Sequence, residues 1–215
     1  MREQTIVVLG RFDAGKTTFI KSVSNAATAL EGPRAAEEAP TQGIVVYDVA
    51  LPGGQSLTFL DTPGFDGYQA GGERAKETEE ILQMLEEHLA ANGSRPVSHV
   101  LVFLNANDMA AIEFKGRARR TFERLFPDAQ VVCVTTRWDQ IEGEDGFPVT
   151  AEEAETKEER LYNSGRTEGS LLEYLDGGRS NGRGVLHFRC GLPTEAYSYP
   201  QDIVQKLLAV PVSRS

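Results

Sequence analysis

The sequence predicts an α/β protein in which a mixed sheet carries helices on both faces. Short apolar runs alternate with segments of helical periodicity along the whole chain, a pattern typical of a largely parallel sheet. Two of the runs, residues 43–51 and 55–61, are separated only by "PGG", which suits a hairpin and is too short for a parallel crossover. This one pair is therefore predicted to be antiparallel.

The elements follow from the same periodicity. Strands are predicted over residues 4–10, 43–51, 55–61, 97–105, 129–136 and 185–190. Helices are predicted between the first strand and residue 30, over 73–91, from 114 to 125, over 151–162 and over 200–209. Residues 31–42 and 177–184 lack periodicity and are predicted to be loops. Because no repeat or linker divides the chain, residues 1–215 are expected to form a single domain.

Composition narrows the possible functions. The chain is 40% hydrophobic and 25% charged, as in ordinary soluble globular proteins, and its formal net charge is −10. Such a charge argues against general nucleic-acid binding, which needs a basic surface. No apolar run approaches the roughly 18 residues that cross a bilayer, and the N-terminus does not resemble a signal peptide. We therefore predict a cytoplasmic protein with no transmembrane segment in this chain and no nucleic-acid partner.

A phosphate-binding loop is predicted at residues 10–17, "GRFDAGKT", which fit the pattern G-x-x-x-x-G-K-[ST] between the first strand and the first helix. In such a loop the backbone N–H groups surround a β-phosphate, at a helix N-terminus that favours anions. Lys16 would reach the β and γ oxygens, and the Thr17 hydroxyl would bind Mg²⁺. Contacts with the nucleotide are expected from Gly10, Arg11, Phe12, Asp13, Ala14, Gly15, Lys16, Thr17 and Thr18.

Two charged residues of this loop have alternative interpretations. Arg11 is a candidate arginine finger, although a side chain at this position more often points outward. Asp13 places a carboxylate beside a bound polyphosphate. It would either help to hold a monovalent cation there or cap the following helix.

The stretch "FLDTPGFDG", residues 59–67, is predicted to be a phosphate sensor. Asp61, at the end of a strand, would hold Mg²⁺ through water, and the N–H of Gly64 would meet the γ-phosphate. Thr41 would close over the same metal from the preceding loop. Phe65 stands where many small GTPases carry a glutamine or histidine that positions water, so this help must come from a backbone group, from Asp66 or from a partner.

The base is expected to be read by "TTRWD", residues 135–139, at the end of the fifth strand. Its last four residues match [NT]-[KR]-x-D. Asp139 would accept hydrogen bonds from guanine, Arg137 would lie over the base, and Trp138 is interpreted as a packing residue. Thr136 replaces an asparagine whose amide ties the neighbouring loops together, which would loosen guanine selectivity. A loop touching the guanine oxygen has no clear counterpart, and Arg189, Cys190 and Gly191 in "HFRCGL" are the candidates there.

Together, "GRFDAGKTTFI", "APTQGI", "FLDTPGFD" and "VTTRWD" resemble the septin-like and immunity-associated (GIMAP-like) P-loop GTPases of the translation-factor-related class. The likeness is closest to small fungal G-domain proteins with a TT-x-WD base motif, and covers residues 4–140 well. The resemblance implies a G domain with a mixed six-stranded sheet, binding of GTP or GDP with Mg²⁺, and nucleotide-dependent dimers or polymers. The chain departs from the pattern in its last base-contacting loop.

Three functions are compatible with these features. The first is a GTPase that hydrolyses GTP to GDP and phosphate slowly, with turnover that rises if a homodimer completes the site. The second is a nucleotide-gated assembly module with negligible hydrolysis, and the third a nucleoside triphosphatase of broad base specificity. Catalytic roles are predicted for Lys16, Thr41, Gly64 and Asp66, and metal binding for Thr17, Thr41 and Asp61. The domain would divide into residues 1–30 (phosphate loop and helix), 31–42 and 61–74 (switches), 134–150 (base reading) and 151–215 (C-terminal part).

Overall fold

The computed structural model describes residues 3–28, 40–51, 54–65, 76–93, 95–108, 111–141, 143, 149–176, 185–191 and 197–209. Its centre is a six-stranded sheet in the order β2-β3-β1-β4-β5-β6. The strands are β1 (Glu3–Gly10), β2 (Val45–Ala50), β3 (Ser56–Asp61), β4 (Val97–Asn105), β5 (Gln130–Thr136) and β6 (Leu186–Arg189). Only the β2–β3 pair is antiparallel. The predicted mixed sheet with one antiparallel pair is confirmed.

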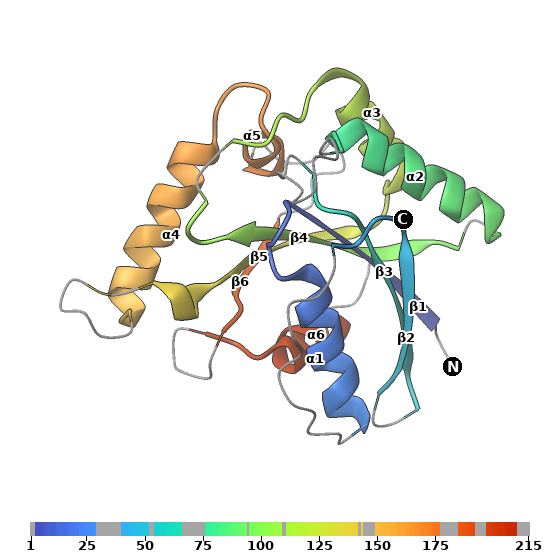
Figure 1. The fold of residues 1–215 in the computed structure, drawn as a ribbon, viewed down its shortest axis with the longest axis horizontal. Helices are drawn as coiled ribbons and strands as arrows, with labels where there is room; N and C mark the ends of the chain where they lie inside the picture. Colours follow the sequence, from blue (N-terminus) through green and yellow to red (C-terminus); the bar gives the residue numbers. More distant parts are fainter. Residues whose placement is uncertain are drawn as a thin grey trace.

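Helices cover both faces of this sheet, as the sequence predicted (Figure 1). They are α1 (Lys16–Thr28), α2 (Thr78–Ala91), α3 (Gly116–Leu125), the 3₁₀ turn η1 (Trp138–Gln140), α4 (Ala151–Gly165), α5 (Leu171–Asp176) and α6 (Pro200–Ala209). Figure 1 shows α1 and α6 on one side of the sheet and α2, α3 and α5 on the other. Two buried clusters correspond to these layers, one with side chains of α1 and α6 and one with side chains of α2, α3 and α5.

The alternation along each strand explains the two layers. In β1, Ile6 and Val8 lie in the cluster under α1 and α6, whereas Val7 and Leu9 lie in the cluster under α2 and α3. Successive side chains of a strand point to opposite faces, so a fully apolar strand must be covered on both sides. A continuous apolar run such as "IVVL" is the sequence signature of this burial.

Some predicted boundaries are wrong. The helix expected over 73–91 begins at Thr78, because Lys76 forms a β-bridge with Phe65 and Glu77 is the N-cap in a capping box with Glu80. The helix expected from Phe114 begins at Gly116. The helix predicted over 151–162 continues to Gly165.

One helix was not predicted at all. Four of the six residues of α5 are buried, Leu171, Leu172, Tyr174 and Leu175. With fewer than two turns, such a segment shows no measurable period, so only its burial against the sheet identifies it.

The β2–β3 hairpin positions part of the functional site. Its turn is closed by hydrogen bonds from Leu51 N to Gln55 O (2.8 Å) and from Gly54 N to Leu51 O (3.2 Å). The register pairs Val45 with Asp61, so the start of β2 lies beside the end of β3. The four residues before β2 therefore bring Thr41 to the carboxyl end of β3.

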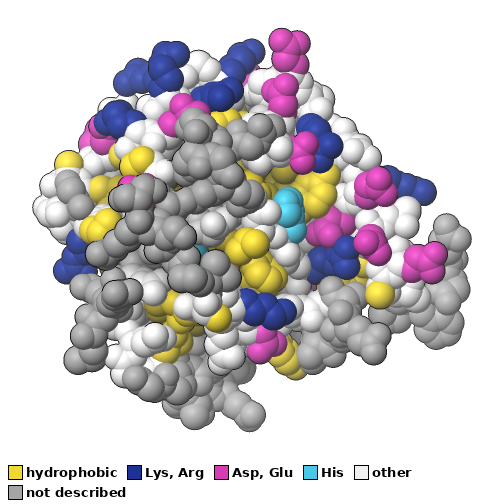
Figure 2. Space-filling view, turned by 180° about the vertical axis from the view of Figure 1, so that it is seen from behind, with side chains coloured by type: hydrophobic (Ala, Val, Ile, Leu, Met, Phe, Trp, Pro, Cys, Tyr) yellow, Lys and Arg dark blue, Asp and Glu magenta, His cyan; other side chains and the backbone are white. Residues whose placement is uncertain are grey.

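The surface seen from behind carries charges of both signs in alternation, with hydrophobic side chains in small groups between them (Figure 2). Val45 and Val46 of the edge strand β2 are 40% and 45% exposed. Within the described parts of the chain, none of the helices combines the length and the apolar character that crossing a membrane requires.

Candidate nucleotide site

The phosphate loop connects the end of β1 to the start of α1. Gly10 has a φ of +153°, and a Cβ there would lie 2.6 Å from the carbonyl oxygen of Phe103 in β4, so only glycine fits. Lys16 Nζ donates to Gly10 O (3.1 Å) and Arg11 O (2.9 Å), which curls its side chain back over the loop. Burial lowers the pKa of Lys16 to about 8, while Asp61 and Asp13 oppose the shift.

Three predicted metal ligands meet beside this lysine. Thr17 Oγ1 donates to Asp61 Oδ2 at 2.6 Å, Thr41 Oγ1 lies 3.3 Å from the same oxygen, and the two hydroxyl oxygens are 3.3 Å apart. The other carboxylate oxygen, Asp61 Oδ1, is buried and has no hydrogen-bond partner among the described residues. Burial raises the pKa of Asp61, and the bond from Thr17 opposes that rise. A hard cation such as Mg²⁺ prefers oxygen ligands of this kind, so these residues fit it.

The turn after Asp61 is packed directly on the phosphate loop. Thr62 Oγ1 donates to Val8 O at 2.7 Å, which fixes the turn to β1. A Cβ on Gly64 would lie 2.4 Å from the backbone of Phe12, so this position accepts only glycine. The predicted phosphate-sensing residue is thus next to the loop that it would act with.

Phe65 is a core residue. It is 1% exposed and belongs to the buried cluster that contains the α2 residues Ile81, Leu82 and Leu85. Its backbone N donates to Gly10 O at 3.3 Å. The side chain at the position where other GTPases place glutamine therefore points into the protein and anchors the segment to α2.

Arg11 faces a partner that the sequence did not indicate. Its guanidinium lies on Asp108 with Nε 3.2 Å from Oδ2 and Nη1 3.4 Å from Oδ1. Asp108 follows β4 in the chain. A role as arginine finger would require Arg11 to leave this ion pair.

Asp13 and Arg137 pair with each other across the site. Arg137 Nη2 forms an ion pair with Asp13 Oδ1, and its Nε lies 3.4 Å from Asp13 O. Both residues have positive φ, 58° and 65°, in the left-handed region that non-glycine residues seldom adopt. In this structure the Arg137 guanidinium neutralises the Asp13 carboxylate.

Thr136 ties neighbouring loops together, a connection that was expected to be lost because threonine stands in place of asparagine. Its hydroxyl lies 3.0 Å from Ala14 O in the phosphate loop and 3.3 Å from Leu104 O in β4. The hydroxyl therefore joins the base-reading strand to both neighbours. The loop connection whose loss was expected is therefore present, and looser guanine selectivity stays a prediction.

Asp139 is the exposed residue of the base-reading turn, and it makes no hydrogen bond or ion pair with other described residues. Trp138, in contrast, is 3% exposed and packs near Tyr197, with ring centroids 5.8 Å apart. Its interpretation as a packing residue agrees with this geometry. Arg189, expected at the base edge, instead donates from Nε to Glu158 Oε2 at 2.8 Å.

Sequence reasoning missed Glu158, Thr135 and Asp108. Glu158 is 9% exposed within a helix whose other acidic residues face solvent, and its partner Thr135 is 23 positions away. No spacing rule connects such residues, and only the fold reveals the contact. Residues 31–39 and 66–74, to which the switches were assigned and which include Asp66, lie outside the described residues. Residues 142 and 144–148 of the base-reading segment do so as well.

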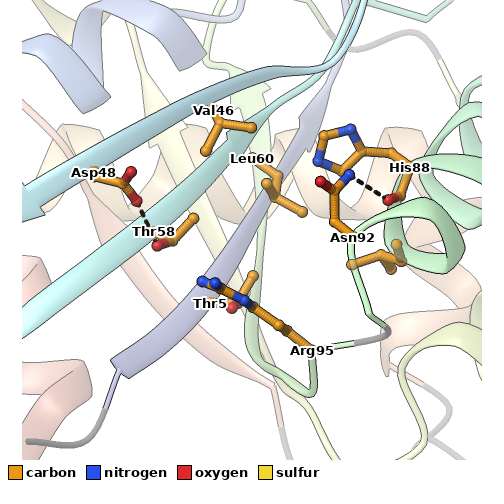
Figure 3. Close-up of a pocket in the computed structure, with 9 residues that line it drawn as sticks. Thr5, Val46, Asp48, Thr58, Leu60, His88, Asn92 and Arg95 are labelled. Atoms are coloured by element: carbon orange, nitrogen blue, oxygen red, sulfur yellow. Dashed lines mark hydrogen bonds between the residues drawn. The ribbon is translucent and has the colours of Figure 1, made fainter.

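A separate cavity of about 210 Å³ lies between the β2–β3–β1 side of the sheet and the C-terminal end of α2 (Figure 3). Its walls are Thr5, Val46, Asp48, Thr58, Leu60, His88, Leu89, Asn92 and Arg95. None of the residues predicted to bind nucleotide lines it. In Figure 3 the Asp48–Thr58 hydrogen bond and the His88–Asn92 contact stand on opposite sides of the cavity.

Residues 5–136 match the family described as the 50S ribosome-binding GTPase. The chain belongs to this family. The matched range contains the phosphate loop, the Thr41–Asp61 pair, Gly64 and the first two residues of "TTRWD". The predicted assignment to P-loop G domains of the translation-factor-related class is therefore confirmed at this level.

Proteins similar to this 50S ribosome-binding GTPase family member include translation initiation factors IF-2. That of Prosthecochloris aestuarii is 32% identical over 84 residues, which are 38% of this chain and 8% of the factor. That of Granulibacter bethesdensis is 37% identical over 86 residues, 39% of this chain and 9% of the factor. The chain thus spans less than a tenth of the length of these relatives.

Solved structures of Era share the fold. A point variant of Aquifex aeolicus Era bound to GDP and aluminium fluoride aligns with 98% of this chain and 58% of its own, at a TM-score of 0.50 and 14% identity. Era in complex with MgGDPNP and a segment of 16S ribosomal RNA aligns with 100% of this chain and 59% of its own, at a TM-score of 0.50 and 15% identity. At such identities the likeness concerns the fold.

Proposed function

We propose that this G domain binds GTP with Mg²⁺ and hydrolyses it to GDP and phosphate. The observation that carries the proposal is the meeting of Thr17, Thr41 and Asp61 beside Lys16, with the buried Asp61 Oδ1 left without a hydrogen-bond partner among the described residues. A buried carboxylate oxygen normally has a partner, and a divalent cation supplies one.

Different residues are proposed to bind the phosphates and the base of the nucleotide. Lys16 exchanges its two carbonyl partners for phosphate oxygens, and the N–H of Gly64 donates to the γ-phosphate. Asp139 accepts from the guanine N–H groups, which adenine does not offer. Bound Mg²⁺ neutralises charge on the transferred phosphoryl group. Thr17, Thr41 and Asp61 are the residues that hold this ion.

Turnover is proposed to be slow. The Phe65 side chain is buried and cannot orient water, so the group that does so is a backbone N–H, Asp66 or a residue of a second copy. Single-turnover hydrolysis measured over a series of protein concentrations distinguishes a residue of a second copy from a group within the chain. A rate that rises with concentration supports a nucleotide-dependent homodimer, and a constant rate above background supports a group within the chain.

The direct test identifies the nucleotide that copurifies with the protein and the product formed from GTP with Mg²⁺ or with EDTA. Thr17→Ala should reduce hydrolysis at least tenfold, because it removes a metal-binding hydroxyl. Ser22→Ala, one turn further along α1, is the matched control and should be unchanged. GTP bound but left intact in both buffers would support the assembly module, and equal use of ATP would support the broad triphosphatase.

Finer features are part of the same proposal. The motifs "FLDTPGFD" and "VTTRWD" favour a septin-like or GIMAP-like subfamily. A monovalent cation at Asp13 would bind when Arg137 swings from that carboxylate onto the base. The single domain over residues 1–215 and the cytoplasmic location stay predictions of the sequence.

A further inference from the structure

A buried polar network lies directly behind the base-reading turn. Trp138 Nε1 donates to Thr135 Oγ1 (3.1 Å), and Thr135 Oγ1 donates to Glu158 Oε1 (2.8 Å). The other carboxylate oxygen of Glu158 accepts from Arg189 Nε (2.8 Å). The carboxylate of α4 thus receives one hydrogen bond from β5 and one from β6, and both strands lie beside α4 in Figure 1.

Each residue of the base-reading turn before its tip is held by a hydrogen bond or an ion pair, two of them to the phosphate loop and two within the network. Thr136 is bonded to the phosphate loop and Arg137 to Asp13, while Trp138 is held by Thr135. Among residues 135–139, only Asp139 is exposed. The direction of its carboxylate is therefore set by the residues that precede it.

The same network also reaches the end of β6 and the residue that follows it. Arg189 ends β6, and the next residue, Cys190, donates its backbone N–H to Thr135 O at 2.8 Å. Ser198 N then donates to Arg189 O at 2.8 Å. One carboxylate consequently fixes the ends of both β5 and β6.

Burial makes the network sensitive to the loss of any member. Glu158 is 9% exposed, and the side chains of its ion pair with Arg189 are 21% and 11% exposed. A carboxylate in such surroundings must be compensated, so removing Arg189 would leave a charge that has to find water or another donor. Recognition of a base also requires the protein groups that bond it to be held within about 0.5 Å of their productive positions.

We propose that Glu158 and Arg189, together with Thr135, are positioning residues that set the guanine selectivity of this site through Trp138 and Asp139. They act without touching the nucleotide. The inference rests on the proposed function, because it concerns how the same site recognises its base. The chain has no clear counterpart of the loop that touches the guanine oxygen. The ion pair of Arg189 with Glu158 takes over the part of that loop in guanine selectivity.

The test compares the affinities of GDP and ADP for Arg189→Met and wild type. GDP binding should weaken about tenfold, as for the loss of a charged hydrogen bond, whereas ADP binding, set by the phosphate loop, should not change. Thr135→Val is a second variant that leaves no charge unpaired, because Glu158 keeps Arg189. It should shift the GDP/ADP ratio in the same direction by a smaller factor.

Trp138 supplies an independent readout, because it is the only tryptophan in the chain. Emission of the nucleotide-free protein should shift to longer wavelength in Arg189→Met and Thr135→Val as the indole loses its fixed partner. Arg166→Met is the matched control, since it removes an ion pair between exposed side chains of Arg166 and Asp176. Neither its emission nor its GDP/ADP ratio should change.

The outcomes separate this inference from the proposed function. If wild type prefers GDP, Asp139→Ala loses that preference and Arg189→Met keeps it, the network is only structural and the inference is overturned while base reading stands. A wild type without any preference for GDP overturns guanine reading itself. Arg189→Lys keeps a cation beside Glu158. A GDP/ADP affinity ratio closer to wild type in Arg189→Lys than in Arg189→Met would support a role for the ion pair.

Discussion

At the phosphate end of the site, residues from three short motifs meet directly, whereas at the base end an exposed aspartate is held by buried side chains from elements much later in the chain. Lys16, Thr17 and Asp61 lie where strands and loops of the first third of the chain come together. Asp139 depends on Glu158 and Arg189 through Thr135 and Trp138. The first arrangement is local and recognisable by spacing; the second is specific to this fold.

The largest difference between the two ends should appear in Lys16→Ala. The change removes a charged donor that lies at the centre of the phosphate loop, and nucleotide affinity should fall by at least about 100-fold for GDP and ADP alike. Equilibrium binding of both nucleotides measures it, with Lys115→Ala on the opposite layer as control. Retained affinity would disprove the phosphate site, and loss of GDP binding alone would assign the lysine to the base end.

Phe65→Gln tests whether the phosphate end lacks only the glutamine side chain that positions the attacking water in other GTPases. The glutamine amide would enter a buried apolar cluster, so the free energy of unfolding should fall by about 3 kcal/mol or more, against about 1 kcal/mol for Phe65→Leu. Denaturant unfolding gives both values. Hydrolysis should not increase, because the side chain points into the core; an accelerated rate would contradict that orientation.

At the phosphate end, titration of Lys16 should make nucleotide affinity depend on pH. Below pH 8 Lys16 is charged with or without nucleotide, so affinity should be constant. Above that pKa of about 8 the free protein loses the proton, and binding an anion must take it up again. GDP affinity should then fall by up to about tenfold per pH unit. Titration from pH 6.5 to 9.5 tests this, and Lys16→Arg, which stays charged, should give a flatter profile.

The smallest effect concerns the ion pair that spans the two ends. If a monovalent cation binds at Asp13 once Arg137 covers the base, hydrolysis in K⁺ and Na⁺ should differ by about two- to fivefold, as for one exposed charged contact. Asp13→Ala should abolish the difference. Equal rates in both salts for wild type would assign Asp13 to Arg137 alone.

This contrast also explains what the sequence could predict. The phosphate loop, the hairpin and Asp61 follow from glycine spacing, strand alternation and the length of "PGG", all of which act over a few residues. The ion pair of Arg189 with Glu158 spans 31 positions, and nothing in "EERLYNSG" marks the glutamate as buried. The expected place of Arg189 at the base edge and the expected loss of a loop connection at Thr136 were each plausible from the sequence alone. In the structure Arg189 pairs with Glu158, and the Thr136 hydroxyl bonds Ala14 O.

Helix α6 has a consequence for the order in which the protein can form. Ile203, Val204 and Leu207 complete the buried cluster that also holds Phe19 and Ile20 of α1, and Gln201 Nε2 donates to Ser22 O at 3.0 Å. The helix that carries the phosphate loop therefore has an uncovered apolar face until residues 200–209 have been synthesised. During synthesis, which proceeds from the N-terminus, this face is therefore covered only after the last described helix has left the ribosome.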